Sequence, residues 1–361
     1  MKKITRVALI TSGGDCQGLN AAMRGIGKAL HNKVENLEIF GMYDGYRGLV
    51  DGDYKFMEPK DFAGILTQGG TILGTSRQRY IPGKDIVDEN GNSLIPAMKD
   101  TYNRLNLDCL VIMGGNGTQK SAKLLMDAGM NVVTLPKTID NDIYGTDVTF
   151  GFHTAVDIAT DVIDRLHTTA ASHSRILMVE IMGNKAGWLT LYAGIAGGAD
   201  AIIIPEIPYD INKICEAMQK RADNGHCFSI VAVAEGAYSK EEAKLKKKER
   251  AKQRLDAGIT TATNTIASQI QKTTGIETRV CVPGHMLRGG SPSAYDRILA
   301  TRFGVRAAQL IAADKYGVSV AMINAKIGEN PLSEVAGKTK FVDPQGNYVI
   351  TARDLGVSFG D

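Results

Sequence analysis

Two carboxylates, Asp140 and Asp142, stand two positions apart in the sequence PKTIDND at residues 136–142. The apolar residues 132–135 before this sequence predict a strand, so the pair lies on the loop at its carboxyl end, where ligands collect in open α/β sheets. One carboxylate there can take the proton of a hydroxyl nucleophile while the other holds a divalent cation. For this motif alone, a polar loop with helix-capping aspartates is an equal alternative, and the neighbouring motifs argue against it.

Two glycine turns follow two further apolar runs. TSGGD at 11–15 comes after the strand-like residues 7–10, and GGNGT at 114–118 comes after 110–113. Glycine lets the backbone approach a ligand closely, and the free amides at the start of the next helix suit phosphate. Neither turn matches the dinucleotide or the Walker pattern. One such turn is often only a tight connection, but two of them beside a carboxylate loop predict a phosphate-binding site.

The second half of the chain supplies the complementary positive charge. Arg175 follows SHS, Arg279 ends the sequence ETR, and His285 and Arg288 lie in HMLRGGSP at 285–292. The planar guanidinium matches pairs of phosphate oxygens, so arginines beside glycine-rich turns favour a phosphorylated substrate. Surface ion pairing is the alternative for any one of these arginines.

Strand-like and helix-like runs alternate along the chain. Strands are expected at 176–181, 201–204 and 229–234, and helices at 153–167 and 261–274. This alternation predicts an α/β fold with parallel sheets and helices on both faces. Lysines and arginines crowd residues 239–254 among several glutamates, which predicts a solvent-exposed charged helix, with a binding patch as the alternative.

Composition narrows the class of protein. The 361 residues are 43% hydrophobic and carry a formal net charge of +3, so no general nucleic-acid surface is expected. The five cysteines are scattered without metal-type spacing, which favours reduced thiols and a cytoplasmic location. No signal peptide and no membrane-spanning run are recognised.

The motifs TSGGD, GGNGT, PKTIDND, MGN (182–184), ETR (277–279), GHMLRGGSP (284–292) and AYDRILA (294–300) occur in the order seen in one family. From about residue 3 to about residue 304 the chain resembles the 6-phosphofructokinases, in their mixed ATP and pyrophosphate branch. These enzymes phosphorylate the 1-hydroxyl of fructose 6-phosphate. The resemblance implies two Rossmann-like, three-layer lobes with mainly parallel sheets: a phosphoryl-donor lobe of residues 1–151 with roughly 287–336, and a sugar-phosphate lobe of residues 152–286 with roughly 337–361.

The resemblance also implies roles for single residues. Asp140 would be the general base, with Thr138 and Arg77 as further catalytic groups, and Asp142 and Asn116 would hold Mg²⁺. The residues expected at the donor phosphates are Gly13, Gly14, Arg77, Gln78, Gly114, Gly115, Asn116, Gly117 and Thr118. Those expected at the sugar phosphate are Thr138, Ile139, Asp140, Arg175, Met182, Gly183, Asn184, Glu235, Arg279, His285, Met286, Leu287 and Arg288. Arg175 and Arg279 would enter from a neighbouring subunit, which implies a homodimer or a homotetramer with shared sites.

The phosphoryl donor is the open question. Pyrophosphate users in the family typically carry Asp at the position of Gly117, where its charge would oppose the α-phosphate of ATP. Lys137 argues for pyrophosphate as the donor, because pyrophosphate users and some ATP users carry Lys at this position. We expect ATP as co-substrate, with reversible pyrophosphate-dependent transfer, to fructose 6-phosphate or a related sugar such as sedoheptulose 7-phosphate, as the alternative. A regulatory subunit without chemistry is a third interpretation, and retention of the charged motifs argues against it.

Two single positions and one whole site depart from the common family pattern. Asn116 stands where Asp is common near magnesium, and Asn184 where Arg is common at the sugar. The effector site of related bacterial enzymes is not retained. Arg24 remains, but the other positions that are basic in those enzymes carry Lys28, His167, Asn224 and Phe228 here. Only His226 lies where a further basic residue would be expected. A site that grips effector phosphates needs several cations together, so those effectors are not expected to bind.

Overall fold

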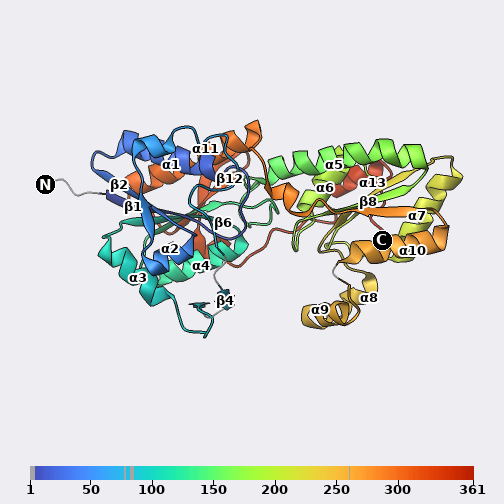
Figure 1. Ribbon diagram of the computed structural model, residues 1–361, viewed down its shortest axis with the longest axis horizontal. Coiled ribbons are helices and arrows are strands. Elements are labelled where there is room, and N and C mark those ends of the chain that lie inside the picture. Colours follow the sequence, from blue (N-terminus) through green and yellow to red (C-terminus); the bar gives the residue numbers. More distant parts are fainter. Residues whose placement is uncertain (1–4, 77–78, 82–84, 260) are drawn as a thin grey trace. The chain divides into compact units, whose positions relative to one another are not determined.

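The structure is a computed structural model that describes residues 5–76, 79–81, 85–259 and 261–361. It divides into two compact units: unit 1 comprises Met1–Thr154 and Arg288–Lys340, and unit 2 comprises Ala155–Leu287 and Phe341–Asp361. Each unit has a mostly parallel sheet with helices on both faces (Figure 1), which confirms the predicted α/β fold.

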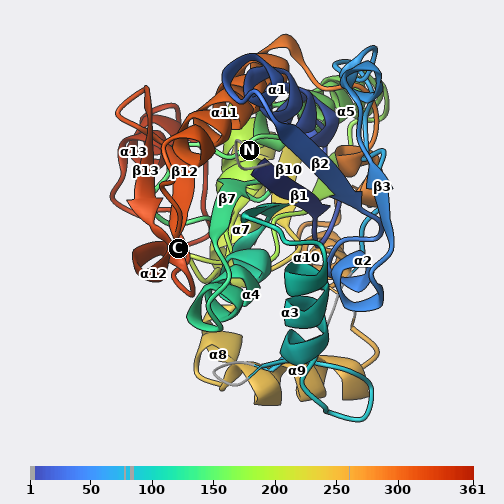
Figure 2. The same cartoon turned by 90° about the vertical axis from the view of Figure 1, so that its left-hand side faces the viewer.

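Unit 1 contains a seven-stranded sheet in the order β13-β12-β7-β6-β1-β2-β3, which Figure 2 shows across its width. The central strands run parallel, and β3 and β13 pair antiparallel at the two edges. In β1 and β6 the apolar residues are completely buried, as expected for parallel strands covered on both faces. The strands are β1 (Thr5–Thr11), β2 (Leu37–Met42), β3 (Tyr54–Phe56), β6 (Cys109–Gly114), β7 (Val132–Pro136), β12 (Val318–Ile323) and β13 (Lys326–Pro331), with a separate hairpin of β4 (Arg79–Ile81) and β5 (Asp85–Val87).

Helices α1 (Leu19–Lys33) and α11 (Ala294–Ala312) lie side by side on one face of this sheet (Figures 1 and 2). They approach closely through glycines, because a Cβ at Gly25 would lie 2.8 Å from the carbonyl oxygen of Thr301. The remaining helices of unit 1 are α2 (Tyr46–Asp51), η1 (Pro59–Phe62), α3 (Ile95–Arg104), α4 (Asn116–Asp127) and α12 (Leu332–Val335). The aliphatic and aromatic side chains on α2, α3 and α4 pack with the strands in one buried cluster.

The parallel order β7-β6-β1 places three loops at one edge of the sheet. The carboxyl ends of these strands are Pro136, Gly114 and Thr11, so PKTIDND, GGNGT and TSGGD follow strands that are direct neighbours. This edge is where ligands bind in open α/β sheets.

Unit 2 has an all-parallel sheet in the order β11-β8-β10-β9. Its strands are β8 (Ile176–Ile181), β9 (Ala201–Ile203), β10 (Ser229–Ala234) and β11 (Thr278–Cys281). The helices are α5 (Phe152–His173), which begins in unit 1, α6 (Trp188–Ala196), α7 (Ile211–Asp223), α8 (Lys240–Ala243), α9 (Lys247–Asp256), α10 (Ala262–Thr274), η2 (Gly284–Arg288) and α13 (Asn347–Asp354). The charged stretch at 239–254, expected as one helix, forms two, α8 and α9, because each has its own N-terminal cap: a capping box between Ser239 and Glu242 begins α8, and the Glu249 carboxylate accepts from the amide of Lys246 at 2.8 Å before α9.

In the described part of the chain, no helix combines the length and the apolar character needed to cross a bilayer.

Candidate active site

The turn after β1 is held by the segment that follows Gly74. Gly13 has φ +81°, a left-handed conformation that favours glycine. Its amide donates to the carbonyl oxygen of Ser76 at 3.3 Å, and Thr75 Oγ1 donates to the carbonyl oxygen of Gly13 at 2.7 Å. Arg77 and Gln78, both expected at the donor phosphates, follow Ser76 directly and lie outside the described residues.

The turn after β6 leads into α4, and its glycines differ in how much space surrounds them: Gly114 is tightly packed, whereas Gly117 faces open space. A Cβ at Gly114 would collide with the side chain of Thr118, whose Oγ1 donates to Ser12 Oγ at 3.3 Å and so joins the two glycine turns. A Cβ at Gly117 would meet no atom within 4 Å. The first turn of α4, with its unpaired amides, therefore has free space beside it that suits a phosphorylated ligand.

Lys137 is buried against the first glycine turn. Its side chain is 2% exposed, and Nζ donates to the carbonyl oxygen of Gly14. Burial lowers the pKa of this ammonium from its ordinary value, and the nearby Arg288 guanidinium acts in the same direction. Arg288 Nη1 donates to the carbonyl oxygen of Asp15 at 2.9 Å. Arg288, expected at the sugar phosphate, thus lies against the first glycine turn in this structure.

The carboxylate loop is shaped by hydroxyl groups. The amide of Asp140 donates to Thr138 Oγ1 at 3.1 Å, and Thr149 Oγ1 donates to the carbonyl oxygen of Thr138 at 2.6 Å. Asp140 is half-buried, whereas the neighbouring Ile139 is completely buried. The loop therefore presents Asp140 partly to solvent and anchors Ile139 in the core.

Asn141 and Lys340 fix the centre of the same loop, and sequence reasoning gave neither of them a role. Asn141 has φ +51° and is 2% exposed, and its Oδ1 accepts from the amide of Thr149 at 3.1 Å and from Lys340 Nζ at 3.0 Å. Lys340 Nζ also donates to the carbonyl oxygens of Thr146 and Asp147, both at 2.9 Å. The asparagine between two aspartates was a usable signal for Asn141, because asparagine adopts the left-handed conformation more readily than most residues. Lys340 lies about 200 residues away, and no local pattern marks it.

The residues expected to hold magnesium offer oxygen ligands. Asp142 is 5% exposed, and its carbonyl oxygen accepts from the amide of Lys340 at 2.8 Å. Asn116 Nδ2 donates to the carbonyl oxygen of Lys338 at 3.0 Å and to Thr339 Oγ1 at 2.8 Å, which leaves Oδ1 as its ligand atom. The described residues contain no group of three or more His, Cys, Asp or Glu side chains placed to hold a metal. One carboxylate and one amide oxygen fit Mg²⁺, which takes few protein ligands and completes its shell with water and phosphate.

In unit 2, Glu235 holds the loop after β8. Its Oε1 accepts from the amides of Gly183 at 3.2 Å and Asn184 at 2.6 Å, and so it fixes the Met182–Asn184 segment. Gly236 permits the close approach of the two loops, because a Cβ there would collide with the carbonyl oxygen of Asn184. The structure thus brings together four of the residues expected at the sugar.

Arg175 and Arg279 lie elsewhere in unit 2. Arg175 Nε donates to Glu277 Oε2 at 2.7 Å, and Arg279 pairs with the other oxygen of the same carboxylate. The hydrogen bond from Arg175 holds the pKa of Glu277 below its ordinary value. Arg175 precedes β8, and Arg279 pairs with the second residue of that strand. Both arginines therefore lie at the amino end of β8, roughly 17 Å from its carboxyl end, where the Met182–Asn184 segment begins.

The GHMLR sequence forms the 3₁₀ helix η2. His285 and Met286 are exposed, with Met286 67% exposed, whereas Leu287 is completely buried. Of these three residues expected at the sugar, the side chains of the first two are accessible to a ligand.

The model of the family described as phosphofructokinase matches residues 6–311 of the chain. A curated ATP-dependent 6-phosphofructokinase from Spirochaeta thermophila is 55% identical, covering 98% of this chain and 97% of the relative. ATP-dependent 6-phosphofructokinase 3 of Bacteroides thetaiotaomicron is 45% identical, covering 98% of this chain and the whole of the relative.

Solved structures give the same result. Pichia pastoris phosphofructokinase in the T-state matches with a TM-score of 0.79 at 30% identity, covering 99% of this chain and 37% of the yeast chain. A pyrophosphate-dependent phosphofructokinase from Marinobacter aquaeolei has the same TM-score at 18% identity over 96% of this chain and 88% of its own, which shows the fold alone. With its two glycine turns, its carboxylate loop and these matches, the chain belongs to the phosphofructokinase family.

Proposed function

We propose that the chain phosphorylates the 1-hydroxyl of fructose 6-phosphate with ATP, the committed phosphorylation of glycolysis. The observation that carries this proposal is the gathering of three loops at the carboxyl ends of β1, β6 and β7, with open space beside Gly117. The curated relatives named ATP-dependent 6-phosphofructokinase support the same donor.

ATP enters at the two glycine turns. The amides at the start of α4 and the Lys137 ammonium supply positive charge for the phosphates. Gly117 adds neither bulk nor charge where the α-phosphate would pass, so the nucleoside portion is not excluded. Arg77 and Gln78 remain part of this proposal as residues beside the donor phosphates.

Asp140 takes the proton of the attacking 1-hydroxyl. Phosphoryl transfer requires mainly positioning and charge neutralisation, and the half-buried carboxylate of Asp140, whose backbone amide donates to Thr138 Oγ1, can orient the hydroxyl and accept its proton. Asp142 and Asn116 would hold Mg²⁺, which neutralises charge on the phosphates when bound. The Met182–Asn184 segment, Glu235 and His285 bind the sugar phosphate in the proposal.

The arginine pair is assigned to a neighbouring subunit. Arg175 and Arg279 lie at the opposite end of β8 from Met182–Asn184, so one chain cannot bring all of them to one sugar phosphate. This placement supports a homodimer, or a homotetramer built from dimers, whose sites are shared. A cytoplasmic location is the final part of the proposal, and the scattered cysteines favour it.

Pyrophosphate-dependent transfer to the same sugar is the second candidate. The observation that favours it is Lys137, whose ammonium is buried at the donor turn and would bind the phosphates of either donor.

Product analysis tests the proposal. Purified protein with fructose 6-phosphate, ATP and Mg²⁺ should yield fructose 1,6-bisphosphate and ADP in equal amounts by phosphorus NMR, and chelation of the metal should stop the reaction. Phosphate appearing at another hydroxyl, or ATP hydrolysis without a sugar product, would reject it.

A further inference from the structure

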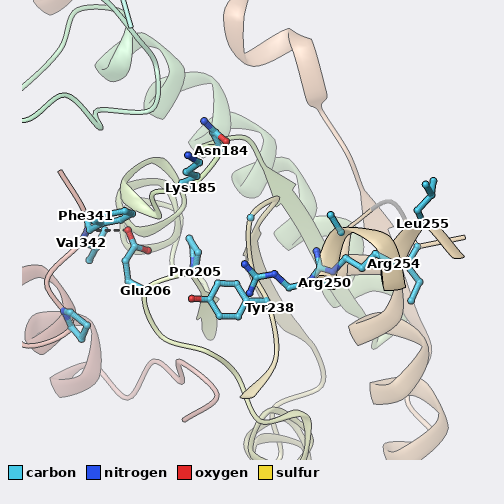
Figure 3. A pocket seen from close by; sticks show the side chains of 14 residues that line it. Asn184, Lys185, Pro205, Glu206, Tyr238, Arg250, Arg254, Leu255, Phe341 and Val342 are labelled. Carbon is cyan, nitrogen blue, oxygen red and sulfur yellow. Dashed lines mark hydrogen bonds between the residues drawn. The ribbon is translucent and has the colours of Figure 1, made fainter. Parts of the chain in front are cut away.

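A cavity of about 870 Å³ lies in unit 2 beside the loops that follow β8, β9 and β10. Figure 3 shows Glu206 and Val342 on one side of it, Arg250, Arg254 and Leu255 on the other, and Tyr238 between them. Its size is that of a small-molecule site, and it lies at the carboxyl edge of a parallel sheet, where such sites form. Of the residues expected at the sugar phosphate, only Asn184 lines it.

The positive charges of this pocket are not all neutralised by the protein. Arg254 is paired with a carboxylate of the protein, because its Nε and Nη2 donate to the two oxygens of Glu242 at 2.5 and 2.8 Å. Lys185 and Arg250, in contrast, have no carboxylate within 4 Å among the described residues. Two cations therefore remain for a ligand.

Among the described residues, the one acidic side chain that lines the pocket, Glu206, is already hydrogen-bonded to the protein. Glu206 accepts from the amide of Gly187 at 2.9 Å and from the amide of Val342 at 2.9 Å, and so it ties two segments of the wall together. Its carboxylate is held by the protein backbone and does not neutralise Lys185 or Arg250. The lining thus favours an anion over a cation.

The rest of the wall is aromatic and aliphatic. The guanidinium carbon of Arg250 lies 3.9 Å from the centre of the Tyr238 ring, which fixes the cation over a flat apolar surface. Leu255 and Phe341 also line the pocket and are 79% and 53% exposed. Exposed apolar side chains beside an oriented guanidinium match a ligand with a ring and a negative group.

We propose that this pocket binds a small aromatic anion, at a site that shares only Asn184 with the residues expected at fructose 6-phosphate and none with those expected at ATP. The site goes beyond the proposed catalytic function and uses α9, a helix that has no role in it. Its wall includes Gly236, the neighbour of Glu235, which holds the Met182–Asn184 segment. A bound ligand would therefore contact the loops that are expected to position the sugar.

The test uses 8-anilinonaphthalene-1-sulfonate, an aromatic sulfonate that fluoresces in apolar surroundings. The titration is done with fructose 6-phosphate and a non-hydrolysable ATP analogue present at saturation, so that the substrate sites are filled. Trp188, the only tryptophan of the chain, follows Gly187 and can sensitise the dye by energy transfer. We expect one sensitised dye per chain.

Arg250→Ala should raise the Kd of this dye at least tenfold, since a charge-assisted contact contributes roughly ten- to a hundredfold in affinity. Lys252→Ala is the matched control, because Lys252 is exposed on the same helix and does not line the pocket. N-phenyl-1-naphthylamine, which lacks the sulfonate, should bind both variants equally. Ala251→Phe, which fills the pocket and keeps its charge, should weaken both dyes and provides a second test if Arg250→Ala is unstable.

Three results would overturn the proposal. One is an equal Kd for the sulfonate in the wild-type protein and in both pocket variants. The second is complete displacement of the dye by the substrate-site ligands. The third is an equal loss of sulfonate binding in Lys252→Ala, which would indicate general surface charge. None of these results depends on turnover, so a failure of the proposed activity would be recognised separately.

Discussion

Replacing Gly117 by Asp should lower kcat/KM for ATP strongly without disturbing the fold of the chain. Gly117 is exposed in the first turn of α4, and a Cβ there meets no atom within 4 Å, so the new side chain fits. A carboxylate in the first turn also interacts favourably with the helix dipole. The effect of the substitution on ATP is therefore electrostatic.

Its size follows from the charge separation. A carboxylate about 5 Å from an oxygen of the α-phosphate repels it by about 3 kcal/mol at an effective dielectric constant near 20. Because 1.4 kcal/mol corresponds to a factor of ten, kcat/KM for ATP should fall roughly a hundredfold or more. Pyrophosphate has no nucleoside to place and should lose much less.

The assay is kcat/KM for both donors at saturating fructose 6-phosphate, in the wild-type protein, Gly117→Asp and Gly117→Asn. The Asn variant has the same shape without the charge and should lose less than tenfold with ATP. If Asp and Asn reduce ATP use equally, shape and not charge is responsible. If Asp leaves kcat/KM for ATP within about threefold, the α-phosphate does not pass Gly117 and the placement of the donor is wrong.

Three further predictions concern the carboxylate loop and the subunit interface. Asp140→Asn should keep fructose 6-phosphate binding but lower kcat by about 10²–10⁴-fold, the usual contribution of a positioned base, and near-normal turnover in the folded variant would reject the assignment. Arg175→Ala and Asp140→Ala should each be nearly inactive alone and regain activity as mixed hybrids, whereas no recovery after verified subunit exchange would place Arg175 in the site of its own chain. Lys340→Met should lower the free energy of unfolding by about 2–4 kcal/mol, because three acceptors lose their donor; urea denaturation measures this against the exposed control Lys338→Met, and equal midpoints would contradict it.

The sequence predicted those parts of the fold that depend on local pattern. The strands expected at 176–181 and 229–234 have these bounds in the structure, because continuous apolar runs between turn residues are characteristic of buried parallel strands. The helix expected at 153–167 begins one residue earlier and continues to His173. The residues in its last turns are mostly small or polar and lack the periodic spacing of apolar residues that marks a helix. The sequence therefore predicted a helix that was too short.

The site could be predicted only where chemistry and local geometry coincide. Gly13 in a left-handed turn and the carboxylates after β7 follow from residue type and position. The hydrogen bonds of Lys340 and Thr339 to the loops of Asn141 and Asn116 connect residues about 200 positions apart, and such contacts have no periodic signature. The position of Arg288 against Asp15 likewise depends on side-chain packing and not on spacing.

The pocket beside Tyr238 could not be predicted for a related reason. The charged stretch at 239–254 was expected to be a solvated helix, and most of α9 is indeed exposed. Two of its arginines nevertheless line a cavity, because the capping box at Ser239 and the pairing of Arg254 with Glu242 hold the segment against the sheet edge. Composition shows the charge of such a helix but not what one of its faces contacts.

The central claim is ATP-dependent phosphorylation of fructose 6-phosphate, and one measurement tests it most directly. The wild-type protein is given fructose 6-phosphate and Mg²⁺ with either ATP or pyrophosphate, and kcat/KM is determined for each donor. We expect fructose 1,6-bisphosphate from the mixture with ATP. If pyrophosphate also gives this product, its kcat/KM should be at least tenfold lower than that of ATP. A higher kcat/KM for pyrophosphate would mean that Lys137 outweighs the open space at Gly117, and would contradict the account.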